Sequence, residues 1–292
     1  MVKYVLHFFK EQTRQFDFEQ MLSFFDEIPE AREDANNGEY TNQFKILYNN
    51  PILASKAEFI LTNKSVVRDL HRLNPRFLDV NMRVEIPVMT TSFAANFIFE
   101  IVKKLCEEFD FYVYNEHFKD VIELRMPTVI RSFEMTKEAF KEKYNYLLDD
   151  IYFCPKDKLN DILKYVNEQY SLQRYYRDQE VYVPNYYIVV DENKNLYFSI
   201  HWQEGKLTVF PPHLDYVYYN TNNSTKTTII PYHELIAKIE KLTTNVPGFL
   251  ENTKVIENKK NRKKVASALK KAKFTNVEKH FKRINLDQII DF

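Results

Sequence analysis

Apolar and polar positions recur with two different periods along the first third of the chain. Residues 4–9 favour a strand, and a helix follows over residues 18–28, with Asp17 at its N-cap and Pro29 at its end. An acidic loop then leads to an apolar run at residues 44–48, and a turn precedes a second strand at residues 57–62. The pattern therefore predicts strands and helices in mixed order.

The clearest strand lies at residues 78–86, where apolar and polar residues alternate without interruption. Thr91 or Ser92 then caps a helix that runs to residue 109, and a short strand follows at residues 111–114. This order of elements predicts an α+β fold, in which two helices pack on an antiparallel sheet, with the ferredoxin-like topology as the specific candidate. We further expect edge strands at residues 121–124 and 129–133 around Pro127, and a helix that Thr136 caps and that runs to about residue 148.

In the second half of the chain, the pattern of apolar and polar residues predicts a β-meander with helices. An apolar stripe indicates a helix that includes residues 159–166, and later runs indicate strands and one further helix. The expected strands are 186–190, 196–202, 207–210, 216–219 and 227–230, and the further helix is 233–242. We expect three parts: an α+β domain (1–145), the meander with helices (146–250) and a basic helical C-terminal segment (251–292).

Glycine is scarce, and this changes the range of functions to consider. Only Gly38, Gly205 and Gly248 are present among 292 residues. A phosphate-binding loop or a dinucleotide fingerprint needs two or three glycines close together, because only glycine allows the tight turn and the close backbone approach. We therefore expect no glycine-rich nucleotide site and no cofactor.

The two cysteines, Cys106 and Cys154, lie far apart, which argues against a disulfide framework or a thiolate metal site. The N-terminal apolar run is too short for a signal peptide, and no run of 18 apolar residues occurs. We therefore predict a cytoplasmic protein without a membrane partner. Cys154 precedes an expected helix start, where a helix dipole would lower a thiol pKa, but a buried thiol is the simpler interpretation.

Charge is distributed unevenly. Residues 254–283 hold twelve Lys and Arg against two acids, a net charge of +10, and the chain as a whole is neutral. The charge of this segment is consistent with three roles. It could bind nucleic acid in a salt-dependent manner, it could dock on an acidic surface of its own chain or of a partner, or it could form a solvated helix. We also expect a short last helix with Thr275 and Glu278 in a capping box. The candidate contact residues are Lys259, Lys260, Arg262, Lys263, Lys264, Lys270, Lys271 and Lys273.

Two further groups of residues are candidates for chemistry or contact. Tyr and Arg residues interleave around position 175, and such side chains often anchor protein partners, although core packing explains them equally well. The residues of this possible partner surface are Arg174, Tyr175, Tyr176 and Arg177. His201 and His213, with Glu204 or Asp215, would form a hydrolase or transferase site only if they share one pocket.

No motif assigns a function. We name no catalytic or metal-binding residue, and the zincin pattern fails because Ala237 stands where its second histidine would be. The leading hypothesis is a non-enzymatic cytosolic protein-interaction module. The alternatives are a nucleic-acid-binding protein that uses residues 254–283, and a His/carboxylate hydrolase or transferase.

Overall fold

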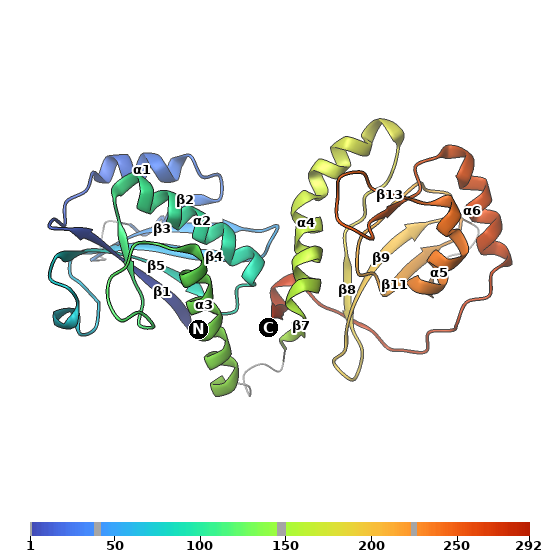
Figure 1. The fold of residues 1–292 in the computed structure, drawn as a ribbon. Coiled ribbons are helices and arrows are strands. Elements are labelled where there is room, and N and C mark those ends of the chain that lie inside the picture. Colours follow the sequence, from blue (N-terminus) through green and yellow to red (C-terminus); the bar gives the residue numbers. More distant parts are fainter. Residues whose placement is uncertain (1, 38–41, 145–149, 223–226) are drawn as a thin grey trace. The chain divides into compact units, whose positions relative to one another are not determined.

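The computed structural model describes residues 2–37, 42–144, 150–222 and 227–292. The chain divides into two compact units, Met1–Asp149 and Asp150–Phe292, which are described separately below (Figure 1). Both units combine sheets with packed helices, which confirms the α+β class. No helix among the described residues combines the length and the apolar composition that crossing a bilayer requires.

The first unit contains a six-stranded sheet in the order β2-β3-β4-β5-β1-β6, with all its neighbours antiparallel. Its strands are β1 (Lys3–Glu11), β2 (Ala31–Glu33), β3 (Gln43–Asn50), β4 (Ser55–Thr62), β5 (Phe77–Pro87) and β6 (Tyr112–Tyr114). The expected antiparallel sheet with packed helices is therefore present. The ferredoxin-like topology stays a prediction. That topology has four strands in its minimal form, whereas this sheet has six.

Three helices cover one face of this sheet: α1 (Phe18–Asp26), α2 (Ser92–Phe109) and α3 (Met126–Tyr144) (Figure 1). Alternate residues of β1, beginning with Tyr4, point into the core that these helices complete. The Asp17 side chain accepts from the Gln20 amide and Thr91 accepts from the Ala94 amide, so both caps are confirmed. Among the described residues, no α-helix packs its apolar side on the opposite sheet face, which includes Lys3 and His7, and the loop after β4 with its 3₁₀ turn covers part of that face.

Three predictions about residues 121–136 were wrong. Residues 129–133 lie inside α3 rather than in an edge strand, and Thr136 lies within that helix instead of capping it. In the helix, Val129 and Phe133 lie one turn apart on the same side, and both are buried in the core. Residue 122 makes only an isolated bridge to Val113. The predicted end of this helix, residue 148, lies outside the described residues.

The second unit is built on a five-stranded sheet in the order β12-β11-β9-β8-β15. Its strands are β8 (Tyr187–Val190), β9 (Leu196–Gln203), β11 (Tyr216–Asn220), β12 (Thr227–Pro231) and β15 (Lys282–Arg283). This differs from a meander, because β11 runs parallel to β9. The reason is that β10 (Val209–Phe210) leaves the sheet and pairs with β14 (Lys254–Val255), which in turn pairs with β13 (Thr244–Asn245).

Helices α4 (Lys156–Tyr176), α5 (Tyr232–Ile239) and α6 (Lys259–Lys271) pack with this sheet around one apolar core. Short 3₁₀ turns lie at Leu70–Arg72 in the first unit and at Arg177–Gln179, Glu240–Leu242 and Leu286–Gln288 in the second. The chain ends with β16 (Ile289–Asp291), which pairs in parallel with β7 (Tyr152–Cys154). The first and last segments of this unit are therefore joined.

The expected last helix around Thr275 is absent, because residues 272–281 have no regular secondary structure. The Thr275 amide donates to the Glu234 side chain of α5, and this contact replaces the predicted capping box. Lys279 and Phe281 then contact the sheet side chain Tyr197. Tertiary contacts along this segment thus favour an extended path over a short helix.

Candidate functional site

A layer of aromatic side chains covers the sheet face of the second unit that lies opposite its helices. In β9, Phe198, Ile200 and Trp202 are buried, whereas Tyr197 and His201 alternate with them and so lie on the other face. In β11, Val217 and Tyr219 are likewise buried in the core. We call the outward side chains Tyr187, Tyr197, His201, Tyr216 and Tyr218 the tyrosine face.

The tyrosine face consists of two groups of three rings. In the first group the ring centroids of Tyr187 and His201 are 4.6 Å apart, and Tyr218 lies 5.0 Å from Tyr187 and 5.1 Å from His201. In the second group Tyr197 and Tyr216 lie 5.3 Å apart, and Phe281 of the C-terminal segment contacts both. The strand register brings these residues together, since Tyr218 pairs with His201 across the parallel β9–β11 ladder.

Each ring group has one cation from the C-terminal segment. The guanidinium of Arg283 lies 5.5 Å from the Tyr187 ring centroid, and the Lys279 ammonium lies 4.5 Å from that of Tyr197. Arg283 is held at this position because β15 pairs with β8. The side chain of Lys279 also reaches the carboxylate of Asp191, so its charge is compensated, while Lys282 and Arg283 are exposed.

Three side chains of the tyrosine face, Tyr216, Tyr218 and His201, are uncharged near neutral pH. Burial raises the pKa of Tyr218 to about 12, and it also raises the pKa of Tyr216 above its ordinary value. Burial and the nearby charge of Arg283 lower the pKa of His201. The exposed imidazole of His201 is therefore neutral at pH 7, and the positive charge on this face comes from the C-terminal segment.

The basic residues predicted from the sequence lie elsewhere. Helix α6 packs through Val265 and Leu269 into the same core as Ile200 and Trp202. It is therefore on the sheet face opposite the tyrosine face. All eight predicted cations of residues 259–273 are exposed, and two of them make ion pairs, Lys259 with Glu180 at 2.9 Å and Lys270 with Glu204 at 3.8 Å. The basic helix is docked on its own chain.

The predicted partner surface around position 175 is only partly a surface. Tyr176 is fully buried and belongs to the core of the second unit, so it does not reach a partner in this structure. Tyr175 is 60% exposed, and Arg174 and Arg177 are exposed as well. The helical spacing explains the difference, because adjacent positions on α4 face different directions.

The structure does not join the two histidines and the two carboxylates of the predicted His/carboxylate site. His213 Nε2 lies 2.8 Å from the Asp161 carboxylate, whereas His201 contacts Tyr187 and Tyr218. Asp215 accepts from the backbone amide of Phe198, and Glu204 accepts from that of Asn222. Within the described residues, no contact links His201 to His213, and no group of three or more His, Cys, Asp or Glu side chains could hold a metal ion.

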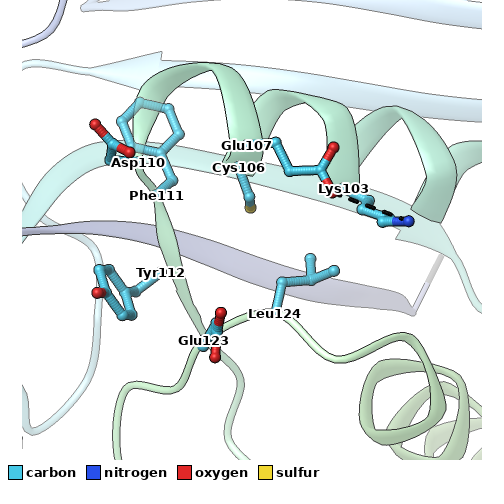
Figure 2. Close-up of a pocket in the computed structure, with 8 residues that line it drawn as sticks. All are labelled: Lys103, Cys106, Glu107, Asp110, Phe111, Tyr112, Glu123 and Leu124. Carbon is cyan, nitrogen blue, oxygen red and sulfur yellow. Dashed lines mark ion pairs between the residues drawn. The ribbon is translucent and has the colours of Figure 1, made fainter.

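Both thiols are buried. Burial raises the pKa of Cys154 to about 11, so the expected helix dipole does not activate this thiol. Cys106 lies at a pocket of the first unit that α2 and the loop after β6 enclose, next to the Lys103–Glu107 ion pair (Figure 2). Burial raises the pKa of Cys106 far above its ordinary value, and Asp110 and Glu123 also line this pocket. The Cys106 thiol is therefore protonated near neutral pH and is not a thiolate nucleophile there.

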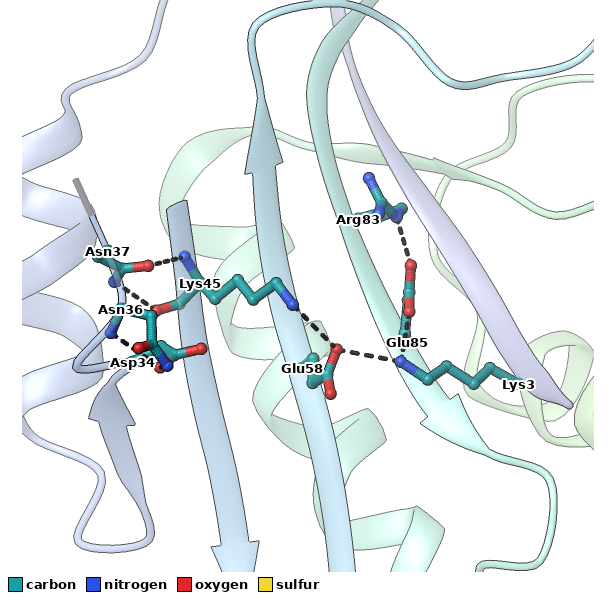
Figure 3. A network of polar contacts seen from close by, with 8 residues as sticks. All are labelled: Lys3, Asp34, Asn36, Asn37, Lys45, Glu58, Arg83 and Glu85. Atoms are coloured by element: carbon teal, nitrogen blue, oxygen red, sulfur yellow. Dashed lines mark hydrogen bonds and ion pairs between the residues drawn. The ribbon is translucent and has the colours of Figure 1, made fainter. Parts of the chain in front are cut away.

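The helix-free sheet face of the first unit carries a polar network (Figure 3). Lys3 of β1 lies 3.0 Å from the Glu58 carboxylate and 2.7 Å from that of Glu85, and Arg83 Nε donates to Glu85 at 2.6 Å. Burial by itself would lower the pKa of Lys3, but its hydrogen bonds to Glu85 and Glu58 raise it. The network thus keeps Lys3 charged and fixed on the sheet.

No family model, curated protein or solved structure matches this chain. The strands of the tyrosine face were predicted from the sequence, but their outward rings were not recognised as one surface. The sequence did contain a signal for this surface. Tyr197 and His201 in residues 196–203, and Tyr216 and Tyr218 in residues 216–220, stand at positions that alternate with apolar residues.

Proposed function

We propose that the protein binds single-stranded nucleic acid on the tyrosine face of its second unit. The observation that carries this proposal is the arrangement of neutral rings in two groups on a helix-free sheet face, with cations beside them. Bases of single strands stack on aromatic side chains whatever their sequence, and nearby Lys and Arg contact the phosphates. The proposal retains nucleic acid as ligand but moves its site away from the basic helix α6.

Stacking supports this assignment more than charge does. Two cations, Lys279 and Arg283, contact rings of the tyrosine face, and Lys279 is paired with Asp191. A stacked base contributes roughly 1–3 kcal/mol, so two or three bases on these rings suffice for moderate affinity. Binding through α6 would instead depend on the seven cations of that helix and hence on counterion release.

The salt dependence of binding separates the two sites. We would measure fluorescence anisotropy of a labelled oligothymidine with the full chain at several salt concentrations. Affinity changes with a logarithmic slope of about −0.7 per neutralised phosphate on single strands, which gives about −1.4 for the two cations of the tyrosine face and about −5 for the seven of α6. A slope near about −1.4, with weak binding to duplex of the same length, supports the proposal.

Variants then locate the site. Replacing Tyr187 or Tyr218 by Leu is expected to weaken binding about 5- to 150-fold, since each removes one stacking ring. Tyr175→Leu, an exposed tyrosine on α4, is the matched control and should leave affinity unchanged. Equal affinity in all three variants, or a slope near −5 that Lys263→Gln and Lys264→Gln reduce, would contradict the tyrosine face as the site.

A protein partner is the second candidate function, as the sequence first indicated. It is favoured by Tyr170 and Tyr175 on α4, which are 68% and 60% exposed, and by an apolar groove that Tyr175 lines together with Val246, Pro247 and Phe249. The test is affinity capture with the wild type and with a Tyr170→Ser, Tyr175→Ser double variant. A stoichiometric partner lost only in the variant supports this function, and the same proteins captured by both would contradict it.

A further inference from the structure

The helix-free face of the first unit's sheet bounds a cavity of ≈ 540 Å³ beside strands β1 and β6. This volume is in the range of small-molecule sites, about 300–1,000 Å³. Lys3, Val5 and His7 of β1 and Tyr114 of β6 contribute the part of the lining that comes from the sheet. The loop after β4 and the loop after β6 contribute most of the rest, and Tyr4 of β1 and Thr136 of α3 also line the cavity.

The cavity lining carries a positive charge. It contains four cations, Lys3, Arg68, Arg72 and Lys119, against two carboxylates, Asp69 and Glu116. Arg72 is paired with Asp69 at 3.5 Å. Within the described residues, neither Arg68 nor Lys119 has an ion-pair partner, and both are exposed to the solvent that fills the cavity. The loops after β4 and β6 thus place cations at the same cavity, and carboxylates neutralise only part of their charge.

The sheet side of the cavity offers two flat rings. The ring centroids of His7 and Tyr114 lie 6.4 Å apart on neighbouring strands. Burial and the nearby Arg83 guanidinium lower the pKa of His7 to about 4, so its imidazole is neutral at pH 7. Lys3 is held beside these rings by Glu58 and Glu85 (Figure 3). A planar group can therefore pack on the rings while an anionic group reaches the loop cations.

We propose that this cavity binds a phosphorylated small molecule of nucleotide size. Its phosphate would lie among Arg68, Arg72 and Lys119, and its planar ring would pack on His7 and Tyr114. Arginine and lysine side chains bind phosphate through charge-assisted hydrogen bonds. A chain with three glycines has no glycine-rich backbone cradle, and the groups that this cavity offers to a phosphate are side-chain cations. This site belongs to the first unit and does not rest on the tyrosine face.

Isothermal titration of the full chain with adenosine monophosphate, inorganic phosphate and succinate tests this proposal. We expect adenosine monophosphate to bind, inorganic phosphate to bind more weakly, and succinate not to bind. The Arg68→Gln, Lys119→Gln double variant should lower the affinity for adenosine monophosphate about tenfold or more. Lys103→Gln, at an exposed lysine of α2 whose helix covers the other sheet face, is the matched control and should bind as the wild type does.

Three results would overturn the proposal: no heat from adenosine monophosphate at up to about 10 mM, equal affinity in the double variant, or succinate binding as tightly as the nucleotide. Tyr218→Leu separates this site from the tyrosine face. Unchanged binding in that variant supports a site in the first unit, and its loss would move the nucleotide to the second. Arg68 and Lys119 are exposed side chains, so their replacement should leave the fold intact, and circular dichroism checks this.

Discussion

The ammonium of Lys279 lies 3.2 Å from the buried carboxylate of Asp191, 88 positions earlier in the chain. Asp191 also accepts from Asn195 and from the Tyr197 hydroxyl, at 3.1 and 3.0 Å. These contacts attach the C-terminal segment to the β8–β9 turn and bring Phe281 and Arg283 to the tyrosine face. The basic C-terminal segment is thus part of the second unit's surface.

Replacing Asp191 by Asn should lower the free energy of unfolding by about 1–3 kcal/mol at pH 7, because hydrogen bonds to a charged acceptor are lost. Burial alone would raise the pKa of Asp191, but its hydrogen bonds, led by those from Asn195, lower it. The stabilisation by its charge is therefore present above the ordinary aspartate pKa near 4 and is lost as the pH falls toward the lower folded value. Urea unfolding at pH 7 and pH 2 measures both effects.

The control for this prediction is Glu192→Gln, at the adjacent exposed acid. It should leave the unfolding free energy nearly unchanged at both pH values. An Asp191→Asn variant as stable as the wild type at pH 7, or equally destabilised at pH 2, would show that the carboxylate does not hold the segment.

Leu269→Ala should destabilise the second unit by about 2–3 kcal/mol, since Leu269 is buried in the core that α6 completes. Lys271→Ala, at an exposed position of the same helix, is the matched control and should cost little. Thermal unfolding followed by circular dichroism compares them. If both variants unfold at the wild-type temperature, α6 does not pack on the unit as described. Val255, Ile256 and Val265 are also core residues, so deleting residues 254–292 would damage the fold as well as remove charge.

Cys154 should react with a thiol reagent at pH 8 at least about 100-fold more slowly than a free thiol. Burial raises its pKa to about 11, whereas an unperturbed cysteine has a pKa near 8.5 and is the nucleophile only as thiolate. Mass spectrometry of a Cys106→Ser variant after timed exposure to iodoacetamide gives the rate. Addition of urea should restore ordinary reactivity, and rapid labelling of the native chain would refute a protonated thiol.

Binding of single strands should be insensitive to pH between 7 and 8 and should strengthen near pH 5. Burial and Arg283 lower the pKa of His201, so its ring becomes charged only below the ordinary histidine range, and the charge then attracts phosphate. Anisotropy titrations at several pH values test this in the wild type and in His201→Phe, which keeps an aromatic ring. The same increase in both proteins would show that another group is responsible.

Local patterns predicted much of the fold. The strand at residues 78–86 and the caps at Asp17 and Thr91 follow from side-chain period and capping chemistry, which act over a few residues. The α3 region was misread because Pro127 suggested a sheet edge, whereas proline is also favoured in the first turn of a helix. The parallel β9–β11 pairing depends on β10 leaving the sheet for β14, a partner more than forty residues away.

The candidate sites depend still more on tertiary structure. Tyr187 and Tyr218 are 31 positions apart in sequence, and only the register of β8, β9 and β11 makes them neighbours. The cavity of the first unit is less accessible to sequence reasoning, since Arg68 and Lys119 lie in loops without a periodic pattern. By contrast, the conspicuous charge of α6 drew attention to a helix that lies on the opposite face of the sheet from the tyrosine face.

Photo-crosslinking of the full chain to an oligonucleotide that contains 5-iodouracil, followed by peptide mass spectrometry, tests the central claim most directly. The account predicts crosslinks at Tyr187, Tyr216 or Tyr218, and their loss in Tyr187→Leu, Tyr218→Leu chains but not in the Tyr175→Leu control. Crosslinks confined to the peptides of α6 or to the first unit, with the tyrosine face unmodified, would contradict it.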